Sequence, residues 1–160
     1  MESTFSKYDL KIFFGLYCVG IAYLVFIYKR DIDFSWIVKG DLFTNVEAYV
    51  NLVPFKTIIS ALTQMNRALG INAIFEDIIG HMIVFSWFGY FLPRIWDKYK
   101  DPKKFFMLMI GVLILIEIFQ FLTRSGMMDV DDFITNLTGV FLGFIYLRHI
   151  DIEEEEVPYA

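Results

Sequence analysis

Polar side chains in the last third of the chain recur at helical spacing on both sides of a short turn. Glu117, Gln120 and Arg124 lie three and then four residues apart, so they share one stripe of an α-helix. A second triplet repeats this spacing after the turn: Asp129, Asp132 and Asn136. Carboxylates, amides and a guanidinium on two such stripes can either pair with one another or bind a polar ligand.

The two stripes are expected to face each other across an antiparallel helical hairpin whose apex lies near Gly126. Arg124 then lies level with Asp129, and in the same register Glu117 lies level with Asn136. Two interpretations of Glu117 stay open. It is either a structural clamp that is held by neighbouring amides, or part of an outward-facing polar pocket.

Arg124 and Asp129 allow two interpretations as well. The simpler one is an ion pair that braces the turn. The other uses the planar guanidinium, which suits a bidentate grip on phosphate or carboxylate. In that case Arg124 would hold the head group of a lipid or of a cell-wall precursor.

The acidic cluster at the turn does not predict a metal site. Asp129, Asp131 and Asp132 lack the spacing of a calcium-binding loop. Helix N-termini attract Asp in the absence of any metal, because a carboxylate caps the free N–H groups there. We therefore expect Asp129 or Asp131 to be the N-cap of the helix that follows, and we assign no metal.

His81 is a further candidate for the pocket. It lies one helical turn after Asp77 and close to Glu76, so it could relay protons or serve only in packing. The sequence contains no nucleophile elbow, phosphate-binding loop or zinc-ligand spacing. We assign no catalytic residue and no cofactor.

The composition predicts a membrane protein. Of the 160 residues, 57% are hydrophobic and 19% are aromatic, and the mean hydropathy is +0.53. Soluble domains hold about 45–50% apolar residues, so the excess indicates contact with lipid. A net charge of −5 without a basic patch argues against nucleic acid as a partner. Cys18 is the one cysteine, which excludes an intrachain disulfide.

The expected fold class is all-α: a polytopic membrane protein with four transmembrane helices. Residues 1–150 form a single transmembrane domain, and residues 151–160 form an acidic cytoplasmic tail that we expect to be disordered. Pro54 interrupts residues 29–70, so short interfacial helices are expected in this first outer loop. The four predicted spans are residues 12–28, 71–93, 105–123 and 131–147.

Charge predicts the orientation of these spans. Five Lys and Arg residues lie within residues 94–104, and the positive-inside rule places such a segment in the cytoplasm. Both termini are then cytoplasmic, while residues 29–70 and 124–132 lie outside. The two polar stripes therefore belong to the outer leaflet.

Two glycines in the last span suggest close helix packing. Gly139 and Gly143 form a GxxxG pattern, which lets two helix backbones approach. The expected partner is either the helix at residues 105–123 or a second copy of the chain, so the pattern allows a homo-oligomer.

Three stretches, in order, resemble elements of the VanZ-like family of membrane proteins. Residues 51–58 read N-L-V-P-F-K-T-I, and residues 80–93 hold an apolar run with Phe-Gly and a closing Pro. The third and most specific stretch, residues 117–143, holds E-x-x-Q, then R, then D and D-D, then N-x-x-G-x-x-x-G. His81 and Trp87 depart from the family pattern, which usually has Asn and Pro there.

The resemblance implies a small multi-spanning protein of the bacterial plasma membrane. The namesake of the family is associated with resistance to the glycopeptide antibiotic teicoplanin, and the resemblance implies no catalytic mechanism. We expect a protein that binds membrane lipids, a lipid-linked cell-wall precursor or a glycopeptide in an outward-facing pocket. A membrane enzyme or transporter for such a precursor, and a structural bundle without a ligand, remain the alternatives. The expected pocket residues are Glu117, Gln120, Arg124, Asp129, Asp132, Asn136 and His81.

Overall fold

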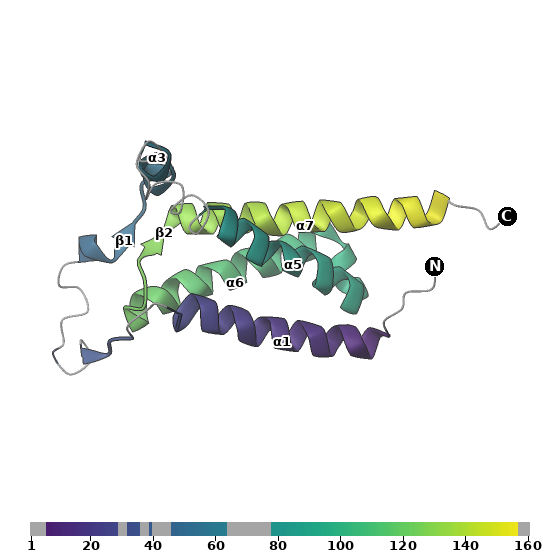
Figure 1. Ribbon diagram of the computed structural model, residues 1–160, viewed down its shortest axis with the longest axis horizontal. Helices are drawn as coiled ribbons and strands as arrows, with labels where there is room; N and C mark the ends of the chain where they lie inside the picture. The colour runs from purple at the N-terminus through teal and green to yellow at the C-terminus, as the bar shows by residue number, and fades with distance from the viewer. Residues whose placement is uncertain (1–5, 29–31, 36–38, 40–45, 64–77, 157–160) are drawn as a thin grey trace.

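Helices account for most of the chain. The computed structural model describes residues 6–28, 32–35, 39, 46–63 and 78–156, and for residues 151–156 it describes the backbone alone. The helices in this part are α1 (Lys7–Phe26), η1 (Val46–Ala48), α3 (Lys56–Thr63), α5 (Gly80–Ile95), η3 (Asp97–Lys100), α6 (Pro102–Thr123) and α7 (Val130–Glu156). Two strands of two residues each, β1 (Val50–Asn51) and β2 (Met128–Asp129), complete the described elements (Figure 1).

Three of these helices are long and apolar enough to cross a membrane: Lys7–Phe26, Pro102–Thr123 and Val130–Ile150. They agree with three of the four predicted spans, although α1 begins five residues before the predicted start. α5 has 16 described residues, or about 24 Å at 1.5 Å per residue. The start predicted for this span, residues 71–77, lies outside the described residues with Glu76 and Asp77, so the fourth crossing stays a prediction.

The acidic end of the chain corrects one expectation. We expected residues 151–160 to be disordered, yet α7 continues through them as far as Glu156. Glutamate is a good helix former, so the acidic residues extend a helix that is already nucleated by the apolar segment before them.

Local signals in the sequence explain where the long helices begin. Ser6 and Asp9 form a reciprocal capping box at the start of α1, which satisfies two N–H groups that the first turn leaves free. α6 begins with Asp101, whose carboxylate accepts from the backbone N–H of Lys103, and with Pro102 in its first turn.

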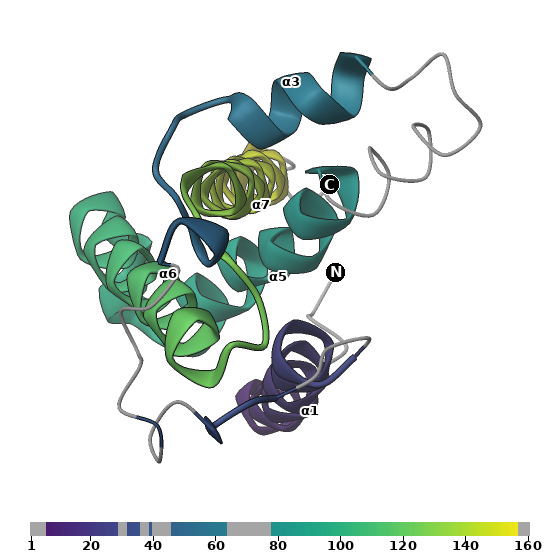
Figure 2. The ribbon, with the colours of Figure 1, turned by 90° about the vertical axis from the view of Figure 1, so that its left-hand side faces the viewer.

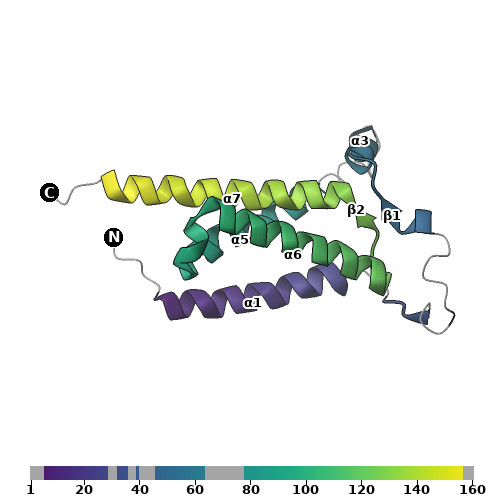
Figure 3. The same cartoon turned by 180° about the vertical axis from the view of Figure 1, so that it is seen from behind.

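The four long helices, α1, α5, α6 and α7, run side by side and form a bundle with two distinct ends. The first turn of α1 and the last turn of α7 lie at one end, and α3, β1 and β2 lie at the other (Figure 1). In the end-on view α7 lies between α3 and α5 (Figure 2). From behind, α6 lies between α7 and α1 (Figure 3).

Glycines bring α5 and α7 into backbone contact. A Cβ added at Gly143 would lie 1.9 Å from the carbonyl oxygen of Ser86, and one at Gly139 would lie 2.2 Å from that of Met82. Gly89 in α5 is packed in the same way against α7. The partner of the GxxxG pattern is therefore α5, which was neither of the two expected partners. Because α5 covers this face, a homo-oligomer would have to use another surface.

Aromatic packing attaches the other two helices. The ring of Phe105 in α6 stacks on that of Phe144 in α7, with centroids 4.7 Å apart. α1 contacts α5 through rings such as Tyr17 and Phe88, and the Tyr17 hydroxyl donates to the carbonyl oxygen of Val84 at 2.6 Å. Ile21 is the one side chain that α1 buries. Other apolar side chains of α1, such as Leu16 and Val19, are exposed, as a surface that contacts lipid would be.

An ion pair joins the start of α1 to the basic segment. The ammonium of Lys7 lies 3.2 Å from a carboxylate oxygen of Asp97 in η3. Lys100 and then Lys7 lower the pKa of the Asp97 carboxyl by hydrogen bonding to it. Both partners are exposed, so the pair adds little stability. It does show that the start of α1 and residues 94–104 share one end of the bundle.

The glycine contact gives the first testable prediction. Gly143→Ala should destabilise the protein by roughly 1–3 kcal/mol or more, because its Cβ would collide with backbone that has no rotamer to change. Gly111→Ala in α6 is the matched control. Nothing lies within 4 Å of its Cβ, and Ala raises helix stability by about 0.5–1 kcal/mol. Thermal unfolding in detergent compares the two, and equal melting temperatures would contradict the contact.

Candidate functional site

A segment of the first loop is tied to the turn before α7. Residues 50–63, here called the strap, run from β1 to the end of α3. β1 pairs with β2 in parallel, with Val50 opposite Met128 and Asn51 opposite Asp129. This contact joins two stretches that lie more than 70 residues apart in the sequence. It places the polar residues of the strap beside the acidic turn.

Asp131 caps the start of α3. Its carboxylate accepts hydrogen bonds from the backbone N–H groups of Thr57 at 2.7 Å and Ile58 at 3.2 Å, and also from that of Phe55. The side chain is 1% exposed. Phe55 has a positive φ of 65°, which is costly for a bulky residue, and the three bonds to one carboxylate stabilise this bend.

Asp129 links the strap to both helices of the hairpin. Its carboxylate accepts from the Asn51 amide at 3.0 Å and from the Thr57 hydroxyl at 2.6 Å. It also accepts from the N–H of Asp131 at 2.9 Å, as an N-cap residue does. The N–H of Asp129 itself donates to the Glu117 carboxylate at 2.9 Å. A chain of hydrogen bonds thus runs from α6 through the turn to the strap.

The bonds of Glu117 differ from those we predicted. The predicted hairpin register paired Glu117 with Asn136. In the structure the Glu117 carboxylate accepts a hydrogen bond from the backbone N–H of Asp129. The connection between α6 and α7 spans six residues and includes β2. It is therefore longer than the tight turn that the prediction assumed, and the two stripes do not meet residue by residue.

The predicted ion pair between Arg124 and Asp129 is wrong. Arg124 follows the last turn of α6 in the left-handed conformation, with a φ of 49°, which turns its side chain out of the stripe. The guanidinium carbon lies 4.6 Å from the centre of the Tyr49 ring, a cation–π distance. The carboxylate of Asp129 is bonded instead to the strap and to the start of α7.

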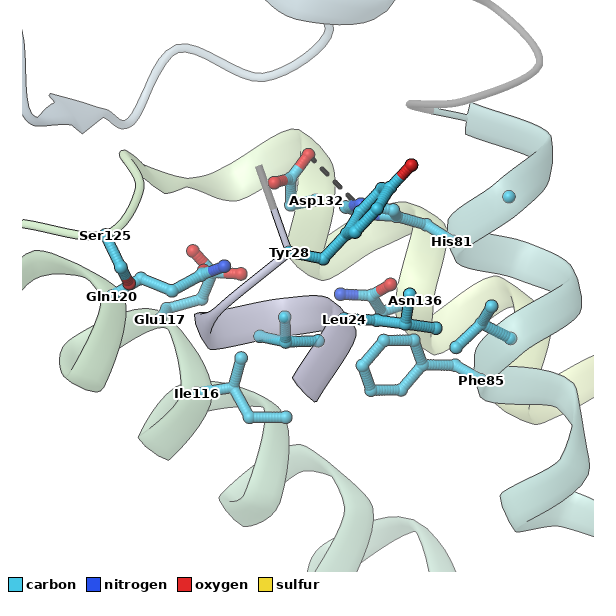
Figure 4. Close-up of a pocket in the computed structure, with 13 residues that line it drawn as sticks. Leu24, Tyr28, His81, Phe85, Ile116, Glu117, Gln120, Ser125, Asp132 and Asn136 are labelled. Atoms are coloured by element: carbon cyan, nitrogen blue, oxygen red, sulfur yellow. Dashed lines mark ion pairs between the residues drawn. The ribbon is translucent and has the colours of Figure 1, made fainter. Parts of the chain in front are cut away.

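A pocket of about 540 Å³ opens between the four long helices (Figure 4). Its position is fixed by the last turns of α1 and α6 and by the first turns of α5 and α7, so it lies at the end that carries the strap. Apolar side chains such as Leu24, Phe85 and Ile116 form one part of its wall. The polar part is formed by His81, Glu117, Gln120, Ser125, Asp132 and Asn136.

Five of the seven predicted pocket residues therefore lie in one pocket. His81 and Asp132 approach each other there, with 3.8 Å between Nδ1 and a carboxylate oxygen (Figure 4), an ion pair if the imidazole is protonated. Glu117, Gln120 and Asn136 complete the set. The other two, Arg124 and Asp129, are absent from the pocket wall. Whether the five bind a ligand stays a prediction.

Two amides in this pocket lack hydrogen bonds. Gln120 and Asn136 are each 3% exposed, and the side-chain oxygen of each is buried without a partner. Throughout the described part of the chain, no donor bonds to either oxygen. A buried polar group without a partner costs about 1–3 kcal/mol, so these two side chains are poorly explained as structural clamps.

The sequence reasoning missed several contributors to this region. Asp131 was considered only as a cap for its own helix, yet it caps α3. Asn51 and Thr57 were noticed only as parts of a motif, and they bind Asp129. The signal was present, because Asn51 and Thr57 are uncharged polar residues in a mostly apolar motif and need partners when they are buried. Their partner lies more than 70 residues away, which local spacing cannot predict.

The carboxylates of the turn are engaged in hydrogen bonds. They accept from N–H and O–H groups. Among the residues whose placement is described, no group of three or more His, Cys, Asp or Glu side chains is arranged to hold an ion.

Comparison with known proteins gives one match. The family model described as VanZ/LLP1 matches residues 14–151, which includes the pocket, the turn and the strap. Searches of curated proteins and of solved structures found no match.

Loss of the Asp131 carboxylate should release the strap. In Asp131→Ala three part-buried N–H groups lose their acceptor, at a cost of up to about 1–3 kcal/mol each. Hydrogen–deuterium exchange of residues 50–63 should become faster by at least tenfold. Asp101→Ala removes a helix cap at the opposite end of the bundle and should leave the strap protected. Unchanged exchange in Asp131→Ala would show that other contacts hold the strap.

Proposed function

The chain belongs to the VanZ-like family, and from this membership we propose that it is a multi-pass protein of a bacterial plasma membrane. In this proposal α1, α5, α6 and α7 all cross the bilayer. The pocket faces outward and binds an amphiphile: a lipid, a cell-wall precursor or the head group of a lipoglycopeptide. By this binding the protein lowers the sensitivity of the cell to teicoplanin-type antibiotics.

The orientation rests on charge. Residues 94–104, with their five Lys and Arg residues, lie at the same end as the start of α1 and the end of α7. The positive-inside rule assigns that end to the cytoplasm. The strap and the pocket lie at the opposite end, which is then open to the outer leaflet.

The unpaired amides of Gln120 and Asn136 are the observation that carries the binding function. A structural bundle would satisfy its buried polar groups internally, because such groups are costly in lipid. These two amides line an open pocket without partners. The mixed wall, polar on one side and apolar on the other, suits a ligand with a head group and a hydrocarbon part.

A membrane enzyme is the second candidate. Glu117 and the His81–Asp132 pair would supply an acid and a base in the pocket. This candidate is weaker for phosphate-bearing precursors, since Arg124 contacts Tyr49 and is absent from the pocket wall. Glu117→Gln separates the two candidates. It keeps an acceptor for the N–H of Asp129 but removes the proton-transferring group, so a binding protein keeps more of its activity than an enzyme does.

The orientation predicts which positions can be labelled from outside. In a Cys18→Ala background, a cysteine at the exposed position Leu52 of the strap should react with a membrane-impermeant maleimide on whole cells. A cysteine at the exposed position Lys100 should react only after the membrane is opened. Labelling of position 100, with position 52 protected, would reverse the orientation.

Filling the pocket with a larger side chain should abolish the tolerance to teicoplanin that we propose for this protein. Val84 lines the pocket, whereas its neighbour Ile83 is 59% exposed on the outer face of α5. Cells with Val84→Trp should become as sensitive to teicoplanin as cells without the protein, and cells with Ile83→Trp should keep full tolerance. Membrane levels of both variants are compared by immunoblot. If Val84→Trp is present at normal levels and tolerance persists, the pocket is not the functional site.

A further inference from the structure

The polar part of the pocket indicates the chemical class of its ligand. We propose that the pocket binds a ligand with a primary ammonium head group attached to a hydrocarbon chain. This inference rests on the proposed function, since it names the ligand class of the same pocket. Three properties of the pocket wall support it: the hydrogen-bonding capacity of the wall, its charge, and its division into a polar and an apolar part.

The hydrogen-bonding capacity favours a donor. The side-chain oxygens of Gln120 and Asn136 are buried without a partner in the described part of the chain, and an amide oxygen can only accept. A primary ammonium presents three N–H donors, which matches in number the two oxygens and one wall carboxylate. An ionised phosphate offers only acceptors, so it would leave these two oxygens without a donor.

The charge of the wall points the same way. Glu117 and Asp132 bring two carboxylates to the pocket, and a protonated His81 would offset one of them. Among the described residues that line it there is no Lys or Arg. Arg124, which precedes the wall residue Ser125 in the sequence, lies against Tyr49. In a medium of low dielectric constant a carboxylate attracts a cation far more strongly than it does in water, so the wall selects a positive head group over a negative one.

The apolar part of the wall accounts for the hydrocarbon chain. Leu24, Val84, Phe85 and Ile116 come from three helices and lie beside the polar group. Burial of a chain contributes about 0.8 kcal/mol for each methylene. A head group that fills the acceptors and a chain that covers these side chains would together occupy both parts of the pocket.

The amides should reduce stability while the pocket is empty. Isosteric apolar replacements, Gln120→Met and Asn136→Leu, remove the unpaired groups and keep most of the volume. We expect each variant to melt at the same temperature as the unchanged protein or at a higher one. A structural role for the amides would give the opposite result, because their loss would then break hydrogen bonds.

The test is calorimetric titration of the protein in phosphatidylcholine nanodiscs, with the heat from empty nanodiscs subtracted. Decylamine should bind saturably. Decyltrimethylammonium carries the charge without N–H donors and should bind at least tenfold more weakly, while decyl phosphate should show no saturable binding. Gln120→Met and Asn136→Leu should each weaken the binding of decylamine by roughly tenfold. Thr138→Val, whose hydroxyl bonds within α7 outside the pocket, should bind decylamine as the unchanged protein does.

Clear outcomes would overturn the inference. Equal affinity for decylamine and decyltrimethylammonium would remove the role of the N–H donors. Saturable binding of decyl phosphate, or undiminished decylamine binding in the double variant Gln120→Met/Asn136→Leu, would also reject it. If Val84→Trp abolishes tolerance but decylamine fails to bind, the pocket function stands and the ammonium inference falls. If decylamine binds and Val84→Trp leaves tolerance intact, the ligand class stands and the link to tolerance falls.

Discussion

The carboxylates at the start of α7 are the contact on which the architecture of the site depends. Asp131 accepts three backbone N–H groups of the strap, and Asp129 accepts from Asn51 and Thr57. In lipid these donors would have no water to replace a lost partner. The N–H of Asp129 also fixes the carboxylate of Glu117. The strap, the turn and one side of the pocket are therefore held by a single set of hydrogen bonds.

This satisfied set contrasts with the pocket beside it. At the turn, carboxylates and N–H groups are matched, while Gln120 and Asn136 are buried without partners a short distance away. The close contact at Gly139 and Gly143 fixes the position of α5 against α7, so the helices cannot collapse onto the amides without losing that contact. Natural proteins tend to break local packing rules at functional sites and to compensate elsewhere.

The helical period of the sequence predicted which polar residues gather, but not how they bond. Glu117, Gln120, Asp132 and Asn136 share a pocket, as their spacing indicated. The pairing of Glu117 with Asn136 failed because the connection brings the backbone N–H of Asp129 to the Glu117 carboxylate. The ion pair of Arg124 failed because a positive φ at that residue redirects its side chain. Both errors arise where the chain leaves the helix, which is where periodicity no longer applies.

The sequence by itself determined the helical class, three long apolar helices and the family, because hydrophobic runs, caps and motifs act over short distances. Only the tertiary structure decided that α5 covers the glycines of α7 and that Asp131 caps a helix that lies more than 70 residues before it. It also decided that the amides of Gln120 and Asn136 stay unpaired. These facts depend on the packing of distant segments, and a buried polar group takes whichever partner that packing brings within reach.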